Sequence, residues 1–552
     1  MAVEPNIAKE RRFFFGRAEK VAFAILTALL VWPYVVALRT PAVGSFNDDG
    51  IYVATAKALA EGRGYTIISL PHAIPQTKYP ILFPLALAGV WKIDPNFPGN
   101  VRLLRLVPFL CALAWFWISF LLVRRETGSS RAARWVALLT AGLPAVVWAG
   151  TTIISETMFA ALATAALLLL AQIEESEGNR PNLAAASAGI LGGAAFLART
   201  VGVALLAAGA ISLGLRRKYR AAAAYAVLWI LIAAPWAIWQ RMEYKPLPTA
   251  EVYYSFANYK DWNLLDSFNW HQKAAIAWQN IRMLAIAPEQ MVAIGPQILL
   301  GLAWVVTALA LWGWLADQQR WKSSLWLFLP FYLGIAVLWA YPPARFLLPV
   351  MPLVLYYAWR GIEDLCPRAR VPEWKAGTAC VAVLVLLLAN GLVRQARITA
   401  RSGYVFLNTG TETWHQMNGA FRWVRSNTQR SAVFVCGWDS AMYLYTGRRA
   451  IRGYNPNAFQ MDYAAHPKDP LGTTAAFGEA ILREGVDYAV VVQDPSARGE
   501  PHFYAELFGR FEARYPGTLR SPVEVAPECV IYRVDRARLA KEMAAGKPAA
   551  AE

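Results

Sequence analysis

The chain has 552 residues, a net charge of +17 and a mean hydropathy of +0.32. Hydrophobic residues make up 57% of it and charged residues only 16%, whereas soluble globular proteins carry about 25% charged residues. This composition excludes a disordered chain and argues against an ordinary soluble enzyme. The 23 Trp and 23 Tyr are typical of a protein with two membrane–water interfaces, where amphipathic rings collect.

Up to residue 394 the sequence is a succession of apolar runs, most of them close to the roughly 20 residues that a helix needs to cross the hydrocarbon core. The pattern predicts a multi-span α-helical membrane domain over residues 1–394, with about eleven spans. The expected spans are 21–38, 103–123, 135–151, 157–173, 183–197, 201–215, 221–239, 291–315, 325–341, 346–359 and 377–393.

Lysine and arginine are concentrated in the loops that this count places on one side, which predicts a cytoplasmic N-terminus in the cell inner (plasma) membrane. Basic residues precede the first span, and further basic loops lie at 124–134, 216–220, 320–322 and 360–375. The acidic loop 174–180 gives no support. The first span is too long for a cleavable signal and lacks a small-residue cleavage site.

Past residue 394 the apolar runs shorten to strand length. Buried strands are expected at 430–437 and 487–493, each preceded by a helix, at 414–427 and 474–484. Strands that alternate with helices predict an α/β domain, here residues 395–552 with a flexible C-terminal tail. The eleven spans would place this domain outside the cytoplasm.

Two features of this C-terminal segment leave alternatives open. Trp438, Tyr443 and Tyr445 near Asp439 form either a sugar-stacking patch or part of a buried core. The five cysteines are scattered and include no C-x-x-C pair, which indicates no disulfide framework. At most Cys436 and Cys529 could form a disulfide, because both fall in this polar segment. The cysteines and the five scattered histidines predict no metal centre.

The first extracytoplasmic loop, residues 39–102, is long and holds unusual residues. Asp48 and Asp49 precede Tyr52 and an amphipathic stretch at 52–61, and Lys78–Tyr79–Pro80 follows about thirty residues later. The apolar stretch 81–91 is too short to span, so it should form a re-entrant or interfacial helix.

Three further charged residues are expected at the same membrane face. Glu156 lies between the third and fourth spans, Arg199 between the fifth and sixth, and Arg345 between the ninth and tenth. Ionisable groups at the ends of apolar spans are costly unless they have partners or water. Together with the first loop, they suggest a site for an anionic, lipid-borne ligand.

Each of these residues also has a simpler interpretation. The aspartates could be solvated loop acids, and Glu156 could be an acid stabilised by the dipole at a helix N-terminus. Lys78 could extend its amine to the membrane surface, and Arg345 could be one more interfacial arginine. The ordered set is therefore more informative than any one member.

The order Asp48–Asp49–x–x–Tyr52, then Lys78–Tyr79–Pro80, resembles the GT-C membrane glycosyltransferases, most closely the lipid A aminoarabinose transferase and protein O-mannosyltransferase group. The resemblance covers the membrane domain but no motif of residues 395–552. Two details differ from the family pattern: Asp49 stands where a Glu is common, and Tyr79 separates the lysine from the proline.

The resemblance implies a sugar transfer from a polyprenyl-phosphate donor to an acceptor hydroxyl, with inversion, on the extracytoplasmic side. The resemblance implies that Asp48 is the general base and that Asp49 orients the acceptor or tunes Asp48. It implies that Lys78 and Arg345 bind the donor phosphate, with Arg199 as a further candidate. It also implies that Glu156, Tyr52 and Tyr79 bind the sugar or the acceptor. We expect no cofactor and no nucleic acid, and the sequence leaves a divalent cation open. The absence of a Gly-rich phosphate loop argues against direct use of a nucleoside triphosphate.

Other functions remain to be weighed against this one. A transporter or lipid flippase commonly has two related halves and charges near the midplane, whereas this chain shows no such repeat and its unusual charges gather at one face. A ligase or polymerase that acts on lipid-linked glycans shares the expected chemistry. The sequence leaves open the sugar, the oligomeric state, and whether the acceptor is a lipid, a glycan or a protein.

Overall fold

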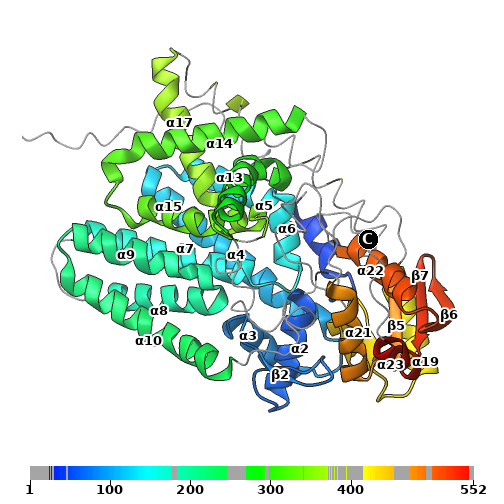
Figure 1. The fold of residues 1–552 in the computed structure, drawn as a ribbon. Coiled ribbons are helices and arrows are strands. Elements are labelled where there is room, and N and C mark those ends of the chain that lie inside the picture. Colours follow the sequence, from blue (N-terminus) through cyan, green and yellow to red (C-terminus); the bar gives the residue numbers. More distant parts are fainter. Residues whose placement is uncertain are drawn as a thin grey trace, which may run out of the picture.

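The computed structural model describes residues 30–44, 46, 48–176, 183–244, 269–292, 298–339, 341–370, 414–452, 472–492 and 500–545, with isolated positions at 24, 27 and between 372 and 393. Helices form the body of the molecule, and a sheet with its own helices lies at one side of that body (Figure 1). The predicted flexible tail at the C-terminal end lies largely outside the described residues.

Most helices of the body follow the predicted apolar runs. In chain order they are α4 Val101–Thr127, α5 Ser130–Gly142, α6 Pro144–Thr151, α7 Glu156–Glu175, α8 Leu183–Ala198, η1 Thr200–Gly202, α9 Val203–Leu215, α10 Tyr219–Glu243, α13 Trp270–Val292, α14 Ile298–Ala316, η2 Asp317–Arg320, α15 Ser324–Val337, α16 Ala344–Leu347, η3 Leu348–Val350 and α17 Met351–Arg368. Helices α8, α9 and α10 lie side by side at one edge (Figure 1). Helix α13 was not predicted, because its sequence is less apolar than that of its neighbours.

Within the described residues, three helices are long and apolar enough to span a membrane: α4, α7 and α10. A fourth span is reached if α5 and α6 are counted together. Several other apolar helices, among them α8 and α15, are shorter than 18 residues. The total of eleven spans therefore stays a prediction. Residues 30–38 of the expected span 21–38 are helical, whereas the expected span 377–393 lies largely outside the described residues.

The predicted span 135–151 is broken into two helices. Pro144 begins α6, and the preceding Leu143 has an extended backbone at φ −64° and ψ 126°, as expected for a residue before proline. The two helices bend by 68° at this break. Trp148 of α6 lies beside the charged residues described below, with its ring centre 5.9 Å from Cζ of Arg345.

Small residues let two of the body helices pack closely. A Cβ added to Gly313 of α14 would lie 1.9 Å from the carbonyl oxygen of Tyr357 in α17, and one added to Gly361 would lie 2.3 Å from that of Leu309. Small residues at such contacts are typical of helix pairs in membranes. The two glycines therefore hold α17 against α14.

The first loop forms α2 Asp48–Ala60, a short hairpin of β1 Thr66–Ile67 and β2 Ile74–Pro75, and α3 Leu82–Ile93. Helix α3 is the short apolar helix expected at 81–91. Helix α2 differs from the amphipathic stretch expected at 52–61: it begins at Asp48 and is buried along most of its length, because α3 and the C-terminal segment both pack against it.

The C-terminal segment contains α19 Trp414–Asn427, β3 Phe434–Val435, α20 Asp439–Thr446, β4 Ala450–Ile451, α21 Gly472–Glu484, β5 Tyr488–Val492, α22 Glu500–Arg514, β6 Leu519–Ala526, β7 Cys529–Val534 and α23 Arg536–Ala544. The sheet has the order β4-β3-β5-β7-β6, with β3 parallel to β4 and β5, and β7 antiparallel to β5 and β6. The helices and strands predicted around 414–437 and 474–493 are thus present. The suggested Cys436–Cys529 disulfide is wrong, since both are buried free thiols.

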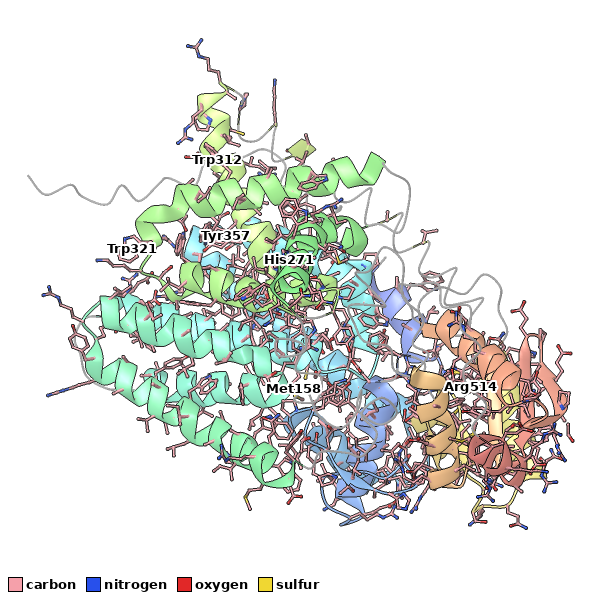
Figure 2. All side chains as sticks on the ribbon, in the orientation of Figure 1. Met158, His271, Trp312, Trp321, Tyr357 and Arg514 are labelled. Carbon is pink, nitrogen blue, oxygen red and sulfur yellow. The ribbon has the colours of Figure 1, made fainter. Side chains whose placement is uncertain are left out.

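One hydrophobic cluster joins the first loop to the C-terminal segment. It contains Ile51 of α2 and Phe83 of α3 together with Phe421 and Phe434, while a second cluster fills the helical body. Met158 packs against both clusters, and Figure 2 shows it near the centre of the molecule. Whether residues 395–552 form a separate domain stays a prediction, but their core is continuous with that of the loop.

Helix α20 makes the closest approach to the first loop. The Tyr445 hydroxyl donates to the carbonyl of Pro41 at 2.6 Å and accepts from the amide of Val43 at 3.1 Å. Trp438, Tyr443 and Tyr445 are all buried. Of the two alternatives for these aromatics, the structure therefore shows buried packing rather than an exposed sugar-stacking patch.

Candidate active site

Arg345 joins two carboxylates from distant parts of the chain. It lies in the one-turn helix α16, after Pro342 and Pro343. Its Nη1 and Nη2 donate to Oδ2 of Asp48 at 3.2 and 3.3 Å. Its Nε donates to Oε1 of Glu156 at 2.9 Å, and Nη2 contacts the same oxygen. The structure thus brings together three residues that the sequence separates by 189 and 297 positions.

Glu156 is the buried member of this group. It is the first residue of α7, where the helix dipole favours a negative charge. Nη1 of Arg199 lies 2.8 Å from Oε1 of Glu156, so that one oxygen serves both arginines. Among the described residues, Oε2 of Glu156 has no hydrogen-bond partner. The alternative of a simple N-terminal helix acid does not account for two guanidinium partners.

Asp48 is the more open of the two acids. Its side chain is 21% exposed, compared with 1% for Glu156. The Tyr79 hydroxyl donates to Oδ1 of Asp48 at 2.6 Å, while Arg345 binds Oδ2. Burial would raise the pKa of Asp48, but the charges of Arg345 and Lys78 and the Tyr79 hydrogen bond together hold that pKa below its usual value. Asp48 is therefore an ionised carboxylate whose orientation is set by two neighbours.

Asp49 faces the other way. Its carboxylate accepts from the amides of Gly44 at 2.8 Å and Phe46 at 3.2 Å, and it is 2% exposed. Burial raises its pKa to about 6, although hydrogen bonds and Arg105 oppose that shift. Asp49 holds the turn before α2, and its predicted part in catalysis stays a prediction.

Lys78 and Tyr79 lie on a loop held by residues that the sequence did not single out. Oε1 of Gln76 accepts from the amides of Lys78 at 2.8 Å and Tyr79 at 3.2 Å. The Tyr65 hydroxyl donates to the carbonyl of Tyr79 at 2.8 Å. Lys78 is buried, with its Nζ 5.0 Å from the centre of the Tyr79 ring. Because the hydroxyl of the same Tyr79 donates to Asp48, the ring of Tyr79 links Lys78 to that carboxylate.

The end of α10 holds the same loop from the other side. The indole of Trp239 donates to the carbonyl of Gln76 at 2.9 Å, and the amide of Gln240 donates to that of Thr77 at 2.8 Å. Gln76 stands beside the quoted Lys78 motif and could have been noticed there. Nothing in the sequence distinguishes Trp239 and Gln240, because aromatic and polar residues commonly stand at the end of a membrane-spanning apolar run.

Aromatic rings surround the guanidinium groups. Cζ of Arg345 lies 4.6 Å from the centre of the Phe46 ring and 5.9 Å from that of Trp148, and Cζ of Arg199 lies 5.5 Å from that of Phe346. A cation over an aromatic face is held without being neutralised. These rings were also missed, since an aromatic residue within an apolar run is usually part of the core.

Tyr52 and Tyr79 contact each other, with ring centres 4.9 Å apart. The Tyr52 hydroxyl shares a 3.1 Å hydrogen bond with Ser155, the residue before Glu156. Arg345, Asp48, Glu156, Arg199 and Lys78 are called the Arg345 cluster below. Every predicted site residue except Asp49 therefore belongs to this cluster or contacts one of its members or their direct neighbours. The predicted roles of the two tyrosines in binding sugar or acceptor stay predictions.

With their usual charges, the two acids Asp48 and Glu156 and the three cations Lys78, Arg199 and Arg345 leave one positive charge in excess. Such a cluster can bind an anion. Among the described residues, no group of three His, Cys, Asp or Glu side chains is arranged to hold a metal ion. The predicted absence of a metal stays a prediction.

No protein-family model matches the sequence, and no curated protein matches it. Solved structures do resemble the fold. ArnT from Cupriavidus metallidurans in the apo state matches with a TM-score of 0.55 and 14% identity, over 94% of this chain and 99% of that chain. The Archaeoglobus fulgidus oligosaccharyltransferase matches with a TM-score of 0.52 and 14% identity, over 84% of this chain and 67% of that chain. The fold of this chain is therefore similar to that of ArnT and of this oligosaccharyltransferase, which is consistent with the GT-C resemblance of the sequence.

The likeness to ArnT extends over most of the chain, including the C-terminal segment for which the sequence offered no motif. ArnT has also been solved with undecaprenyl phosphate bound, a structure that matches this chain with a TM-score of 0.48, 14% identity, and coverage of 94% of this chain and 98% of that chain. At such low identity the likeness concerns the fold, and the chemistry must come from the residues of this chain.

Proposed function

We propose that this GT-C protein transfers a sugar from a polyprenyl-phosphate donor to an acceptor hydroxyl, at the extracytoplasmic face of the inner membrane. The observation that carries the proposal is the Arg345 cluster, in which an accessible carboxylate and three cations meet at the ends of apolar helices. Charged groups in such a position are costly and mark functional sites in membrane proteins.

The proposed reaction is a single displacement at the anomeric carbon. The acceptor oxygen attacks that carbon, and Asp48 takes the hydroxyl proton as general base. The bond from the anomeric carbon to the phosphate oxygen breaks, and the lipid phosphate leaves with the bonding electron pair. Attack opposite to the leaving group inverts the configuration. The products are the glycosylated acceptor and a polyprenyl phosphate, with one proton released from Asp48 afterwards.

The cations suit the leaving group. Negative charge grows on the phosphate as the bond breaks, and preplaced cations stabilise that charge. Arg345 offers a planar fork that can hold two phosphate oxygens, and Lys78 offers a compact point charge. Arg199 is bound to the buried Glu156 and is better placed to support that acid than to meet the donor.

A lipid-linked donor fits the position of the cluster. The site lies where α2, α7 and α16 meet, at the ends of apolar helices, so a donor could enter from the bilayer with its chain among lipid tails. The fold shared with ArnT and the oligosaccharyltransferase supports transfer from a lipid carrier.

The test is transfer by the purified protein in nanodiscs, with a synthetic polyprenyl-phosphate sugar and a panel of lipid, glycan and peptide acceptors. We expect transfer without nucleotide or ion gradient. Asp48→Asn should reduce the rate about 10²- to 10⁴-fold, as is typical when a general base is lost. Movement of the lipid across the bilayer without any transfer would instead support a flippase. Reporter fusions at Arg217 and Gly447 should lie on opposite membrane sides.

A further inference from the structure

In the structure two carboxylates hold Arg345, and a donor phosphate would have to replace at least one of them. The guanidinium of Arg345 uses Nη1 and Nη2 for Asp48, and Nε and Nη2 for Glu156. A phosphate binds to an arginine through the same fork of N–H groups. The two carboxylates therefore occupy the positions that phosphate oxygens need.

We propose that the donor phosphate displaces Asp48 from Arg345, so that binding of the donor releases the base and must precede productive binding of the acceptor. This inference rests on the proposed function and adds an order of events to it. In the structure, Asp48 is paired with the guanidinium of Arg345, which makes it a poor proton acceptor. Once Arg345 turns to the phosphate, Asp48 regains basicity beside the acceptor.

Arg345 is the cation best able to change partners. Its side chain is 32% exposed, compared with 17% for Arg199. The rings of Phe46 and Trp148 hold its guanidinium without carrying a charge of their own. The group can therefore rotate between anions while it stays in place. Arg199 lies deeper, with its guanidinium against Phe346 and Glu156.

The two carboxylates are not left alone when Arg345 leaves. Glu156 keeps the ion pair with Arg199 at 2.8 Å, so no unpaired charge is buried, which would be strongly unfavourable. Asp48 keeps the Tyr79 hydrogen bond at 2.6 Å and the influence of Lys78. The Tyr79 contact would hold the carboxylate in place while its other oxygen becomes free to accept a proton.

With such competition, the apparent affinity for the donor equals the intrinsic affinity multiplied by the fraction of protein in which Arg345 is not paired with Asp48. If the pair with Asp48 is worth about 1 kcal/mol, as for partly exposed ion pairs, its removal should strengthen phosphate binding about fivefold. Loss of the proposed base should thus improve binding of the leaving lipid while it greatly slows transfer.

The experiment measures the affinity of undecaprenyl phosphate for the full-length protein in nanodiscs. The variants are Asp48→Asn, Arg345→Gln and the double variant, with Glu61→Gln as the matched control. Glu61 lies just after α2, is exposed and pairs with Lys57 and Arg63, so its replacement removes the same charge without touching Arg345. We expect Asp48→Asn to bind about fivefold more tightly than the wild type and Glu61→Gln to bind like it.

The double variant separates competition from simple charge removal. If Asp48 competes for Arg345, the gain from Asp48→Asn disappears in the Arg345→Gln background. A gain that persists there would be a through-space effect and would overturn the inference, as would unchanged or weaker binding by Asp48→Asn. Asp48→Ser, which also removes the carboxylate that pairs with Arg345, provides a second test should Asp48→Asn fold poorly, with the same expected gain in binding and the same contradiction if no gain appears. No binding of undecaprenyl phosphate to the wild type would instead contradict the proposed function.

Discussion

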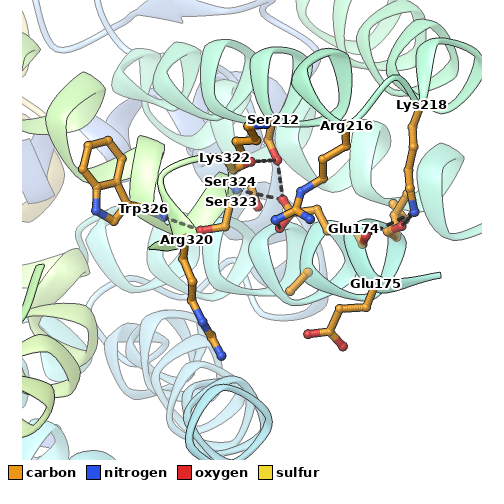
Figure 3. A network of polar contacts seen from close by, with 12 residues as sticks. Glu174, Glu175, Ser212, Arg216, Lys218, Arg320, Lys322, Ser323, Ser324 and Trp326 are labelled. Atoms are coloured by element: carbon orange, nitrogen blue, oxygen red, sulfur yellow. Dashed lines mark hydrogen bonds and ion pairs between the residues drawn. The ribbon is translucent and has the colours of Figure 1, made fainter. Parts of the chain in front are cut away.

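Helix α7 carries a buried acid at each end, and the two acids behave differently. Glu156 opens the helix and Glu174 lies near its close, separated by roughly 27 Å along the axis. Oε1 of Glu174 accepts from the Ser212 hydroxyl and from the amide of Ser324, both at 2.7 Å (Figure 3). Glu174 thereby ties α7 to the end of α9 and to the start of α15.

The rest of the Glu174 network is closed by local groups. The Ser212 hydroxyl also contacts the carbonyl of Lys322 at 2.6 Å, and the Lys218 amine donates to the carbonyls of Ile173 and Glu174 (Figure 3). Arg216 is more distant, at 3.7 Å from Oε2 of Glu174. The partners of Glu174 are thus mainly neutral groups in fixed positions, which suits a structural link.

The Glu156 end is built from charges instead. Its partners are two arginines, one of them shared with Asp48, and the second oxygen of Glu156 has no partner among the described residues. Charged partners with an unfilled position suit a ligand site better than a structural link. The comparison teaches that burial of an acid does not reveal its role, whereas the nature of its partners does.

Replacing each acid with its amide should separate the two roles most clearly. Glu156→Gln leaves Arg199 and Arg345 without their shared anion, so we expect a loss of transfer of about 100-fold or more. Glu174→Gln should keep transfer within a few-fold but lower the thermal midpoint, because a buried hydrogen-bonded charge is worth about 1.5–3 kcal/mol. Transfer rates and unfolding curves of both variants in the same detergent provide the check. The reverse pattern would refute the comparison.

The cations at the Glu156 end should act as one unit. Lys78→Ala and Arg345→Ala should each slow transfer and weaken donor binding, since both are proposed to meet the same phosphate. Their effects should not add in a double-mutant cycle, with a coupling of about 0.5–3 kcal/mol. Rates measured with saturating and limiting donor give this number. Arg320 at the other end of the body, which pairs with Glu126, provides a control whose replacement should be additive with either.

The pKa of Asp49 is raised and that of Asp48 is lowered, so the two residues should make stability change with pH in opposite directions. Because burial raises the pKa of Asp49 to about 6, the folded protein binds more protons than the unfolded chain between about pH 4 and pH 6. The free energy of unfolding should therefore fall by about 3 kcal/mol as the pH rises through that window. Asp49→Asn should remove this dependence. For Asp48 the pKa is lowered, so its contribution is instead lost as the pH falls.

The smallest expected effect concerns the loop that positions Lys78 and Tyr79. Gln76→Leu removes the acceptor for two amides and should reduce transfer several-fold, at a cost near 1–3 kcal/mol for unsatisfied groups. Gln76→Glu keeps an acceptor oxygen and should recover most of the rate. A positioning role also predicts that Gln76→Leu moves the acidic limb of the pH–rate profile to higher pH. The reason is that a weaker hydrogen bond from Tyr79 would raise the pKa of Asp48. An unchanged profile would leave Gln76 with a structural role alone.

The candidate site shows which predictions local sequence supports. Asp48, Lys78, Glu156, Arg199 and Arg345 were found because a charge beside an apolar run is visible without knowing the fold. Their pairing was not visible, and neither was the turn of Asp49 toward the amides of Gly44 and Phe46. Adjacent residues on a helix point about 100° apart, and here Asp48 faces Arg345 while Asp49 faces the amides of the preceding turn.

The sequence by itself determined that the protein is a multi-span membrane protein, where most helices lie, and which charged residues are unusual for their position. These follow from apolar run length and from the cost of charge near lipid, both of which are local properties. Only the tertiary structure decided that Arg345 is shared between Asp48 and Glu156, that Tyr79 orients the base, and that the C-terminal segment shares a core with α2. Such contacts depend on how segments hundreds of residues apart pack against one another, and no pattern along the chain records that packing.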